Sequence, residues 1–261
     1  MTGMDTLLIS DAGAARTITL NRPEDLNAIN EQVTSDLQEA LKAVRKNRVR
    51  CLVITGAGRA FCAGQDLKSV QGRSGGFDFA EALRVRYNPV ISAIRGLEIP
   101  VIASVNGVAA GAGWSLALAC DLRISSSTAK FVSAFGKIGL VPDSGMTQTL
   151  PRLVGYARAL EIAWLGDPIP AKTALEWGLV NKVVEPDALG EATQAWAKAL
   201  ATGPTKGIGL TKRAMASADS RTLDQQLDYE AQLQGIAGQT RDYTEGVKAF
   251  IEKRNPEFLG E

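Results

Sequence analysis

The sequence predicts an α/β fold in which helices cover a largely parallel sheet and a helical region follows. Two nearly continuous apolar runs, at residues 49–55 and 101–105, are typical of strands that are buried on both faces. Segments of helical periodicity lie between and after these runs, which is the alternation expected of a parallel sheet. Helical patterns dominate after Pro151. The sheet is therefore expected in the first part of the chain and helices in the last.

Each expected element rests on its own local pattern. Apolar residues alternate at 7–9 and 16–20 around the turn residues 11–13, which predicts an antiparallel hairpin. Apolar residues then recur at helical spacing over 33–44, and basic residues mark the end of that helix. A shorter strand is expected at 122–125. Further helices are expected over residues 78–95, 113–119, 157–165, 171–177, 189–201, 204–217 and 243–253, with another that begins at 223.

Length and composition indicate one large domain with an appendage. The chain has 261 residues, of which 45% are hydrophobic and 22% charged, as in ordinary globular proteins. We expect a core over residues 1–195 and a C-terminal helical region over residues 196–261. The net charge of +1 is too small to attract nucleic acid or an acidic membrane by long-range electrostatics, so neither is expected as a partner.

The absence of histidine excludes several kinds of catalytic site. A chain with no histidine cannot use a Ser-His-Asp or Cys-His nucleophile, an imidazole general base or a histidine-containing metal site. No metal site is expected. Proton transfer falls to carboxylates, lysine, tyrosine or the backbone.

The cysteine pattern and the N-terminus favour a cytoplasmic protein. Cys51, Cys62 and Cys120 are widely spaced and form no C-x-x-C motif, so a reducing compartment is expected. The N-terminus lacks the apolar core of a signal peptide. The uncharged stretch 99–120 is long enough to be weighed as a membrane span, but its Pro100 favours a buried strand, a turn and a buried helix.

Two glycine-rich turns follow the buried strands, at residues 55–67 and 106–115. Neither matches G-x-G-x-x-G, so a dinucleotide site is not expected. Small residues let a ligand approach the main chain, and helix starts carry unpaired N–H groups. Two such groups that converge on one oxygen would form an oxyanion hole. The same residues are also compatible with ordinary tight turns.

Residues 59–67 and 105–113 resemble the two oxyanion-hole segments of the crotonase (enoyl-CoA hydratase/isomerase) superfamily. The resemblance extends in order along nearly the whole chain, through residues 20–27, 129–131, 139–145, 177–180 and 245–250. It implies a crotonase-type spiral of ββα units with a C-terminal helical trimerisation region, commonly in a dimer of trimers. It also implies an acyl-CoA thioester as substrate, without a further cofactor. The backbone N–H groups of Ala63 and Ala112 would then stabilise a thioester enolate.

The candidate acid and base residues depart from those of the hydratases in this superfamily. Where those enzymes carry two glutamates, the sequence has Ser115 and Phe135. Hydration needs a carboxylate to activate water and an acid to protonate carbon, so it is disfavoured. Asp143 stands where isomerases of the superfamily place an acidic residue, and one carboxylate can move a proton between two carbons. By itself, Asp before Ser-Gly is also a common turn or capping residue.

Residues 61–67, 106–113 and 140–145, with 235–254 near the C-terminus, look most like the isomerases of phenylacetate degradation. Those enzymes convert ring-1,2-epoxyphenylacetyl-CoA to oxepin-CoA and shift double bonds in unsaturated acyl-CoA. The alternatives are another enoyl-CoA isomerase, an enoyl-CoA hydratase, a non-catalytic partner subunit or an RNA-binding relative. The near-neutral charge disfavours RNA.

The same resemblance assigns binding residues. An acyl pocket with an aromatic lining is expected from Phe77, Tyr87, Trp114, Ser115 and Phe135, and burial beside the aromatic rings should raise the pKa of Asp143. The CoA moiety is expected to meet four cations and the segment after the first turn: Arg22, Lys68, Lys248 and Lys253, with Ala60, Gln65, Asp66 and Leu67.

Overall fold

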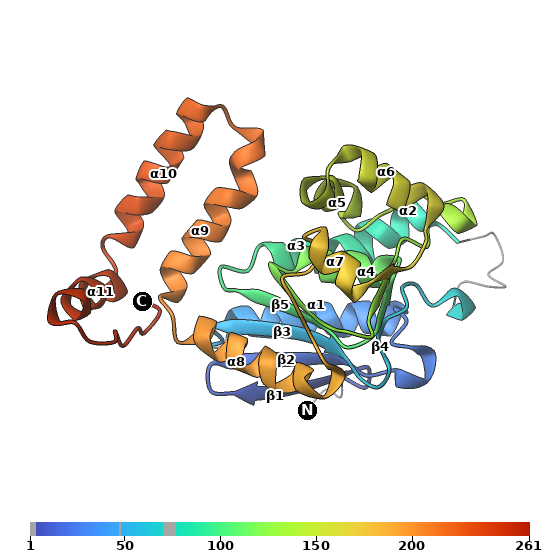
Figure 1. Cartoon of the computed structure of the whole chain (residues 1–261), viewed down its shortest axis with the longest axis horizontal. Coiled ribbons are helices and arrows are strands. Elements are labelled where there is room, and N and C mark those ends of the chain that lie inside the picture. The colour runs from blue at the N-terminus through green and yellow to red at the C-terminus, as the bar shows by residue number, and fades with distance from the viewer. Residues whose placement is uncertain (1–3, 47, 70–76) are drawn as a thin grey trace.

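The computed structural model describes residues 4–46, 48–69 and 77–261, and its strands form two sheets (Figure 1). The larger sheet has six strands in the order β1-β2-β3-β5-β7-β10, and the smaller has four in the order β4-β6-β8-β9. Only the β1–β2 and β8–β9 pairs among these strands are antiparallel. The larger sheet consists of β1 (Leu7–Ala12), β2 (Ala15–Leu20), β3 (Cys51–Gly56), β5 (Val101–Val105), β7 (Leu122–Ser126) and β10 (Lys182–Val184). The smaller consists of β4 (Ala60–Cys62), β6 (Val108–Ala110), β8 (Lys130–Val132) and β9 (Ile169–Pro170).

Three repeats of strand, strand and helical segment build this arrangement. Strands β3, β5 and β7 are neighbours in the larger sheet, and the strand that follows each one, β4, β6 or β8, joins the smaller sheet. A helical segment comes after each pair. The predicted spiral of ββα units is thereby confirmed. Because each turn of the spiral repeats the same path, the loops that follow β4 and β6 come to lie side by side.

The helices cover both sheets. Residues 78–95, expected as one helix, form α2, a π-helical turn (Leu83–Tyr87) and α3 in direct succession. Helix α4 is buried along its whole length, which confirms that the uncharged stretch 99–120 is core. No helix in the described part of the chain is long and apolar enough to cross a membrane. The helices are α1 (Glu31–Lys46), α2 (Phe79–Ala82), α3 (Asn88–Arg95), α4 (Ala112–Ala119), α5 (Met146–Val154), α6 (Tyr156–Leu165), α7 (Ala171–Glu176), α8 (Leu189–Ala201), α9 (Thr205–Ser217), α10 (Leu223–Ala237) and α11 (Arg241–Glu252).

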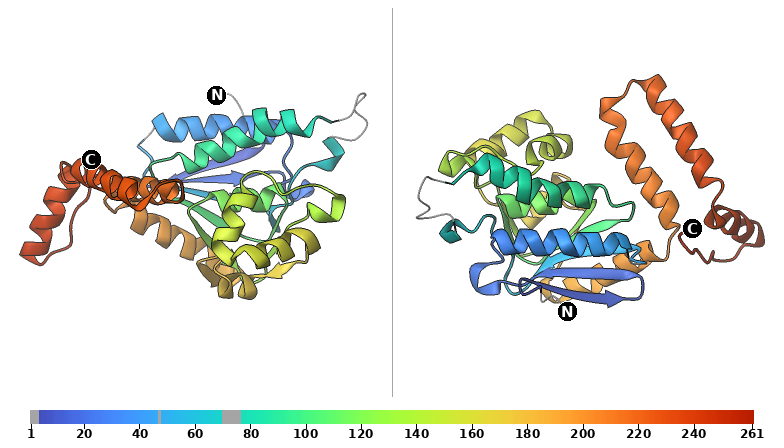
Figure 2. Two further views of the ribbon diagram at one scale, coloured as in Figure 1. Left: turned by 90° about the horizontal axis from the view of Figure 1, so that it is seen from above. Right: turned by 180° about the vertical axis from the view of Figure 1, so that it is seen from behind.

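The larger sheet separates two clusters of buried side chains. Leu52 and Ile54 of β3 face the main cluster, whereas Cys51 and Val53 face a second cluster beneath α8. This alternation explains the continuous apolar run of that strand, because both of its faces are covered. Helices α9 to α11 extend away from the body of the molecule as an arm (Figures 1 and 2).

Some elements were not predicted from the sequence. Strands β4, β6, β8 and β10 have three residues each, too few to show a period of two. Helix α5 contains Pro151, whereas the sequence predicts that helices dominate only after that residue. The division at residue 195 stays a prediction. Since α8 crosses it and packs on the sheet, we propose that the division lies after Ala201.

Candidate active site

A pocket lies where the two glycine-rich turns meet the segments 77–87 and 134–143. It contains eight of the residues that sequence analysis selected, and the lining is otherwise mostly apolar. Those eight are Ala63, Gln65, Leu67, Phe77, Tyr87, Ala112, Phe135 and Asp143. Leu83, Ile138 and Leu140 also line the pocket and were not predicted. The spiral of repeats therefore brings together groups that are far apart in the sequence.

The first turn offers the amide of Gln65 rather than that of Ala63. The Ala63 N–H donates to the carbonyl of Leu26 at 3.0 Å, so the prediction that it serves the oxyanion hole is wrong. The next backbone bonds are made by the Gly64 carbonyl and the Asp66 N–H, both with Ile29. In the described part of the chain, the N–H of Gln65 meets no acceptor. It is a free donor of this turn, at a residue that lines the pocket.

The second turn offers the amide of Ala112. Gly111 precedes α4 with φ +50°, and Ala112 is the first residue of the helix. The first N–H groups of a helix have no partner inside it, and the helix dipole favours negative charge there. The N–H of Ala112 is therefore available to an anionic oxygen.

Two glycines hold these turns together. A Cβ on Gly64, whose φ is +94°, would lie 2.8 Å from the carbonyl oxygen of Ala110 and 3.4 Å from the nitrogen of Ala112. A Cβ on Gly113 would lie 2.3 Å from the carbonyl oxygen of Cys62. Only glycine permits such approaches. The amides of Gln65 and Ala112 consequently belong to two turns in close contact, and both residues line the same pocket, which is compatible with an oxyanion hole.

Asp143 contributes a carboxylate to this pocket. It is half-buried, and its Oδ1 atom is inaccessible and has no hydrogen-bond partner among the described residues. Burial raises the pKa of Asp143, as expected from the sequence, while the neighbouring Ser144 acts in the opposite direction. A carboxylate with a raised pKa is suited both to accept a proton and to return it.

The raised pKa of Asp143 also predicts how stability depends on pH. A carboxyl group that prefers its protonated form in the folded state stabilises the fold below its unfolded pKa, near 3.8. That contribution is lost as pH rises through the higher pKa of the folded state. We expect Asp143→Asn, which cannot ionise, to gain thermal stability relative to wild type between about pH 4 and pH 7. Melting temperatures over this range measure the effect, and a difference that does not vary with pH would contradict it.

Of the four aromatic side chains predicted for the acyl pocket, three line it and one does not, and Phe79 lines it as well. Phe77, Tyr87 and Phe135 are placed as predicted. Tyr87 ends the π-helical turn, and burial, followed by the nearby Asp143 carboxylate, raises its pKa. Trp114 was wrongly assigned, because it is fully buried and packs on Phe131, with ring centroids 5.9 Å apart.

Ser115 also lies outside the acyl pocket, contrary to the prediction. Its side chain is buried in α4, and its hydroxyl donates to the backbone carbonyl of Asp143 at 3.0 Å. The side chain therefore faces the back of the Asp143 loop rather than the substrate.

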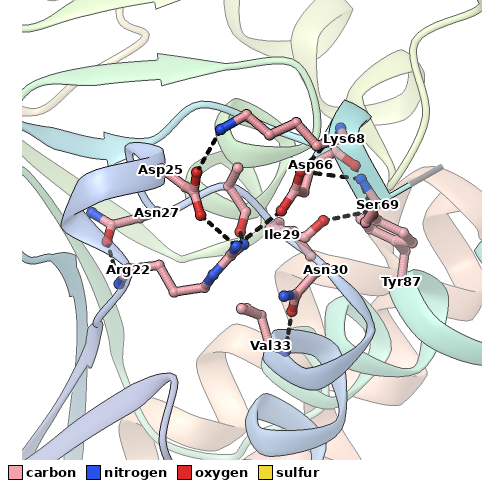
Figure 3. A network of polar contacts seen from close by, with 11 residues as sticks. Arg22, Asp25, Asn27, Ile29, Asn30, Val33, Asp66, Lys68, Ser69 and Tyr87 are labelled. Atoms are coloured by element: carbon pink, nitrogen blue, oxygen red, sulfur yellow. Dashed lines mark hydrogen bonds and ion pairs between the residues drawn. The ribbon is translucent and has the colours of Figure 1, made fainter. Parts of the chain in front are cut away.

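The predicted cations near the pocket are paired with carboxylates (Figure 3). The Arg22 guanidinium donates to Asp25 at 2.6 Å and to Asp66 at 2.9 Å. A third bond joins it to the carbonyl of Ala28. Lys68 contacts Asp25 at 3.1 Å and its side chain is otherwise exposed, so of these two cations it is the more accessible. Arg22 ties the segment after β2 to the first turn, and its contact with CoA stays a prediction.

Two further predicted contacts are used inside the protein. Besides binding Arg22, the Asp66 carboxylate accepts the N–H groups of Lys68 and Ser69. The carbonyl of Ala60 accepts from the side chains of Asn27 and Asn106. Both groups therefore support the turn. Lys248 belongs to α11 and Lys253 follows its last residue, and α11 lies in the arm, away from β4 and α4 (Figure 1).

Comparison with known proteins agrees with this arrangement. A model of the enoyl-CoA hydratase/isomerase family matches residues 11–261. The chain belongs to this family, the crotonase superfamily. Its fold matches the structure of an enoyl-CoA hydratase from Bacillus anthracis with a TM-score of 0.92 at 34% identity, over 98% of this chain and 100% of the other.

Crotonase relatives of this chain include both isomerases and hydratases. A 1,2-epoxyphenylacetyl-CoA isomerase from Escherichia coli K12 is 47% identical over 98% of this chain and 99% of the relative. An (E)-benzylidenesuccinyl-CoA hydratase from Thauera aromatica is 36% identical over 93% of this chain and 94% of the relative. Membership in the crotonase superfamily establishes a CoA-thioester enzyme. Because the relatives include both isomerases and hydratases, the residues of the pocket must distinguish between the two reactions.

Proposed function

We propose that this crotonase is an acyl-CoA isomerase that works through a thioester enolate. The thioester oxygen accepts hydrogen bonds from the N–H groups of Gln65 and Ala112, and Asp143 moves the proton. The main support for the proposal is the number of carboxylates in the pocket. Among the residues described around the pocket, Asp143 alone is acidic.

The reaction follows from these groups. Asp143 removes the proton from the carbon next to the thioester, and the electron pair moves onto the carbonyl oxygen as an enolate. The two amides and the dipole of α4 stabilise the negative charge. When the enolate collapses, the protonated Asp143 returns the proton to another carbon, so the double bond shifts and the base is restored.

Hydration is less well supported than isomerisation. It requires a second group that activates water while the first protonates carbon. The two positions expected to supply carboxylates in a hydratase hold Ser115, whose hydroxyl is bonded to the Asp143 carbonyl, and the apolar Phe135.

We propose an aryl acyl group, and specifically the conversion of 1,2-epoxyphenylacetyl-CoA to oxepin-CoA, in the cytoplasm. The aromatic lining of Phe77, Tyr87 and Phe135 supports an aryl group, as does the name of the Escherichia coli relative. The enolate formed by Asp143 would help to open the strained epoxide before the ring expands. Double-bond shifts in unsaturated acyl-CoA use the same proton transfer.

We also propose that the arm of α9 to α11 packs against further copies of the chain, as a homotrimer or a dimer of trimers. Tyr243, Phe250 and Ile251 of α11 are mostly exposed, which is unfavourable unless another surface covers them. In such an assembly, Lys248 and Lys253 could meet the phosphates of CoA bound to a neighbouring copy.

A comparison of the rates of two reactions tests the proposed activity. We expect 3-hexenoyl-CoA to isomerise about 10²-fold faster than crotonyl-CoA is hydrated, because hydration lacks its second acid–base group. Both products can be followed by mass spectrometry and NMR with the same enzyme preparation. Faster hydration than isomerisation would contradict the proposal.

A further inference from the structure

Ser115 connects the two halves of the candidate active site. It lies on α4 three residues after Ala112, so it belongs to the helix that carries one of the two oxyanion donors. Its side chain is buried, and Oγ is 3.0 Å from the backbone oxygen of Asp143 and 3.3 Å from that of Gly111. The Gly111 carbonyl already accepts the backbone N–H of Ser115 at 3.0 Å. The single hydroxyl proton therefore serves the shorter bond, to Asp143.

The backbone that carries Asp143 forms a tight turn in an uncommon conformation. The Asp143 carbonyl accepts the N–H of Met146 at 3.0 Å, and between them Ser144 and Gly145 have φ values of +53° and +82°. A left-handed serine is strained and persists only where surrounding contacts enforce it. The hydroxyl of Ser115 is such a contact.

The Asp143 side chain depends on this turn for its position. Its Oδ1 has no hydrogen-bond partner among the described residues, so this oxygen is not held directly. The placement of the carboxylate therefore depends on the backbone from which it projects, including the adjacent Ser144 of the same turn. A contact that fixes that backbone relative to α4 also fixes the distance from the base to the amide of Ala112.

We propose that Ser115 is a positioning residue that fixes the distance between the base, Asp143, and the oxyanion donor, Ala112. This inference rests on the proposed isomerase function. Proton transfer and enolate stabilisation act on atoms of the same substrate, so an error of about 1 Å in their separation can cost about 10²-fold in rate. The bond from Ser115 to Asp143 suppresses that error.

The variant Ser115→Ala separates positioning from folding. Without the hydroxyl, the Asp143 carbonyl keeps the N–H of Met146, and the Gly111 carbonyl keeps the N–H of residue 115. No buried acceptor loses its last partner, and alanine is the best helix former. The fold should therefore persist while the turn at Asp143 becomes less constrained.

A matched control is available in Ser125→Ala. Ser125 is as deeply buried as Ser115, in β7, and its hydroxyl also donates to a backbone carbonyl, that of Ser126 at 2.9 Å. It does not line the pocket. The two variants delete the same group from two buried sites.

The experiment measures kcat and KM for 3-hexenoyl-CoA, binding of the unreactive hexanoyl-CoA, and the melting temperature. For Ser115→Ala we expect kcat to fall about 10- to 10²-fold, with KM, binding and melting temperature near wild-type values. Ser125→Ala should retain wild-type kcat. Unchanged kcat in Ser115→Ala, or an equal loss in the control, would overturn the inference.

Asp143→Asn, measured alongside, separates this inference from the proposed function. If Asp143→Asn is inactive and Ser115→Ala is fully active, the positioning role is refuted and the isomerase mechanism stands. If Asp143→Asn retains full activity, the mechanism fails and the positioning role fails with it.

Discussion

Asp143→Asn is expected to slow removal of the α-proton by about 10³-fold, while binding of acyl-CoA stays close to that of the wild type. The amide has nearly the shape of the carboxylate but cannot accept the proton. Since no hydrogen bond to Oδ1 is found among the described residues, the substitution breaks no such bond at that atom. The loss should therefore appear in kcat and leave KM almost unchanged.

Deuterium incorporation measures this effect directly. Phenylacetyl-CoA incubated with the enzyme in D₂O should gain deuterium next to the thioester, as detected by mass spectrometry, even though it cannot isomerise. Asp25→Asn is a suitable control, because Asp25 is close to the pocket but is paired with Arg22 and Lys68 and does not line it. Deuteration at the wild-type rate in Asp143→Asn would exclude Asp143 as the base.

The parts of the site that could be predicted are those that local sequence controls. Asp143 and Ala112 each lie at a fixed place within a short motif, the second at a helix start that leaves its N–H unpaired. Strands β3 and β5 were equally accessible, because burial on both faces gives an unbroken apolar run.

The parts that could not be predicted depend on contacts between distant segments. Whether Ala63 or Gln65 supplies the free amide is decided by the carbonyl of Leu26, which takes the first of them. The glycine at 64 was a usable signal, since a left-handed residue redirects the N–H that follows it. The ion pair of Arg22 could not be predicted either, because its partner Asp66 lies 44 residues further along the chain.

Helix α4 shows why the acyl pocket was partly misjudged. All eight of its residues are buried, so it has no polar face from which the direction of Trp114 or Ser115 could be read. Only the packing of α4 against β4 and the Asp143 loop determines that Trp114 meets Phe131 and Ser115 meets the backbone.

The oxyanion donor on α4 can be removed by a single substitution that the helix should tolerate. Ala112 is the first residue of α4, where proline is well accommodated because its missing N–H has no partner within the helix. Ala112→Pro thus deletes one donor of the hole. We expect kcat for 3-hexenoyl-CoA to fall about 10²- to 10³-fold, the usual loss when one oxyanion donor is removed.

Leu223→Pro provides the control for proline at a helix start, because Leu223 is the exposed first residue of α10 and lies outside the pocket. Melting temperatures near that of the wild type in both variants, with a loss of kcat only in Ala112→Pro, would tie the rate to the amide of residue 112, where proline removes the N–H and places its ring Cδ atom instead. Full activity of a folded Ala112→Pro would mean that the thioester oxygen does not use this amide. Stabilisation of the enolate would then have to come from groups other than the first amide of α4, and the proposed oxyanion hole would be wrong.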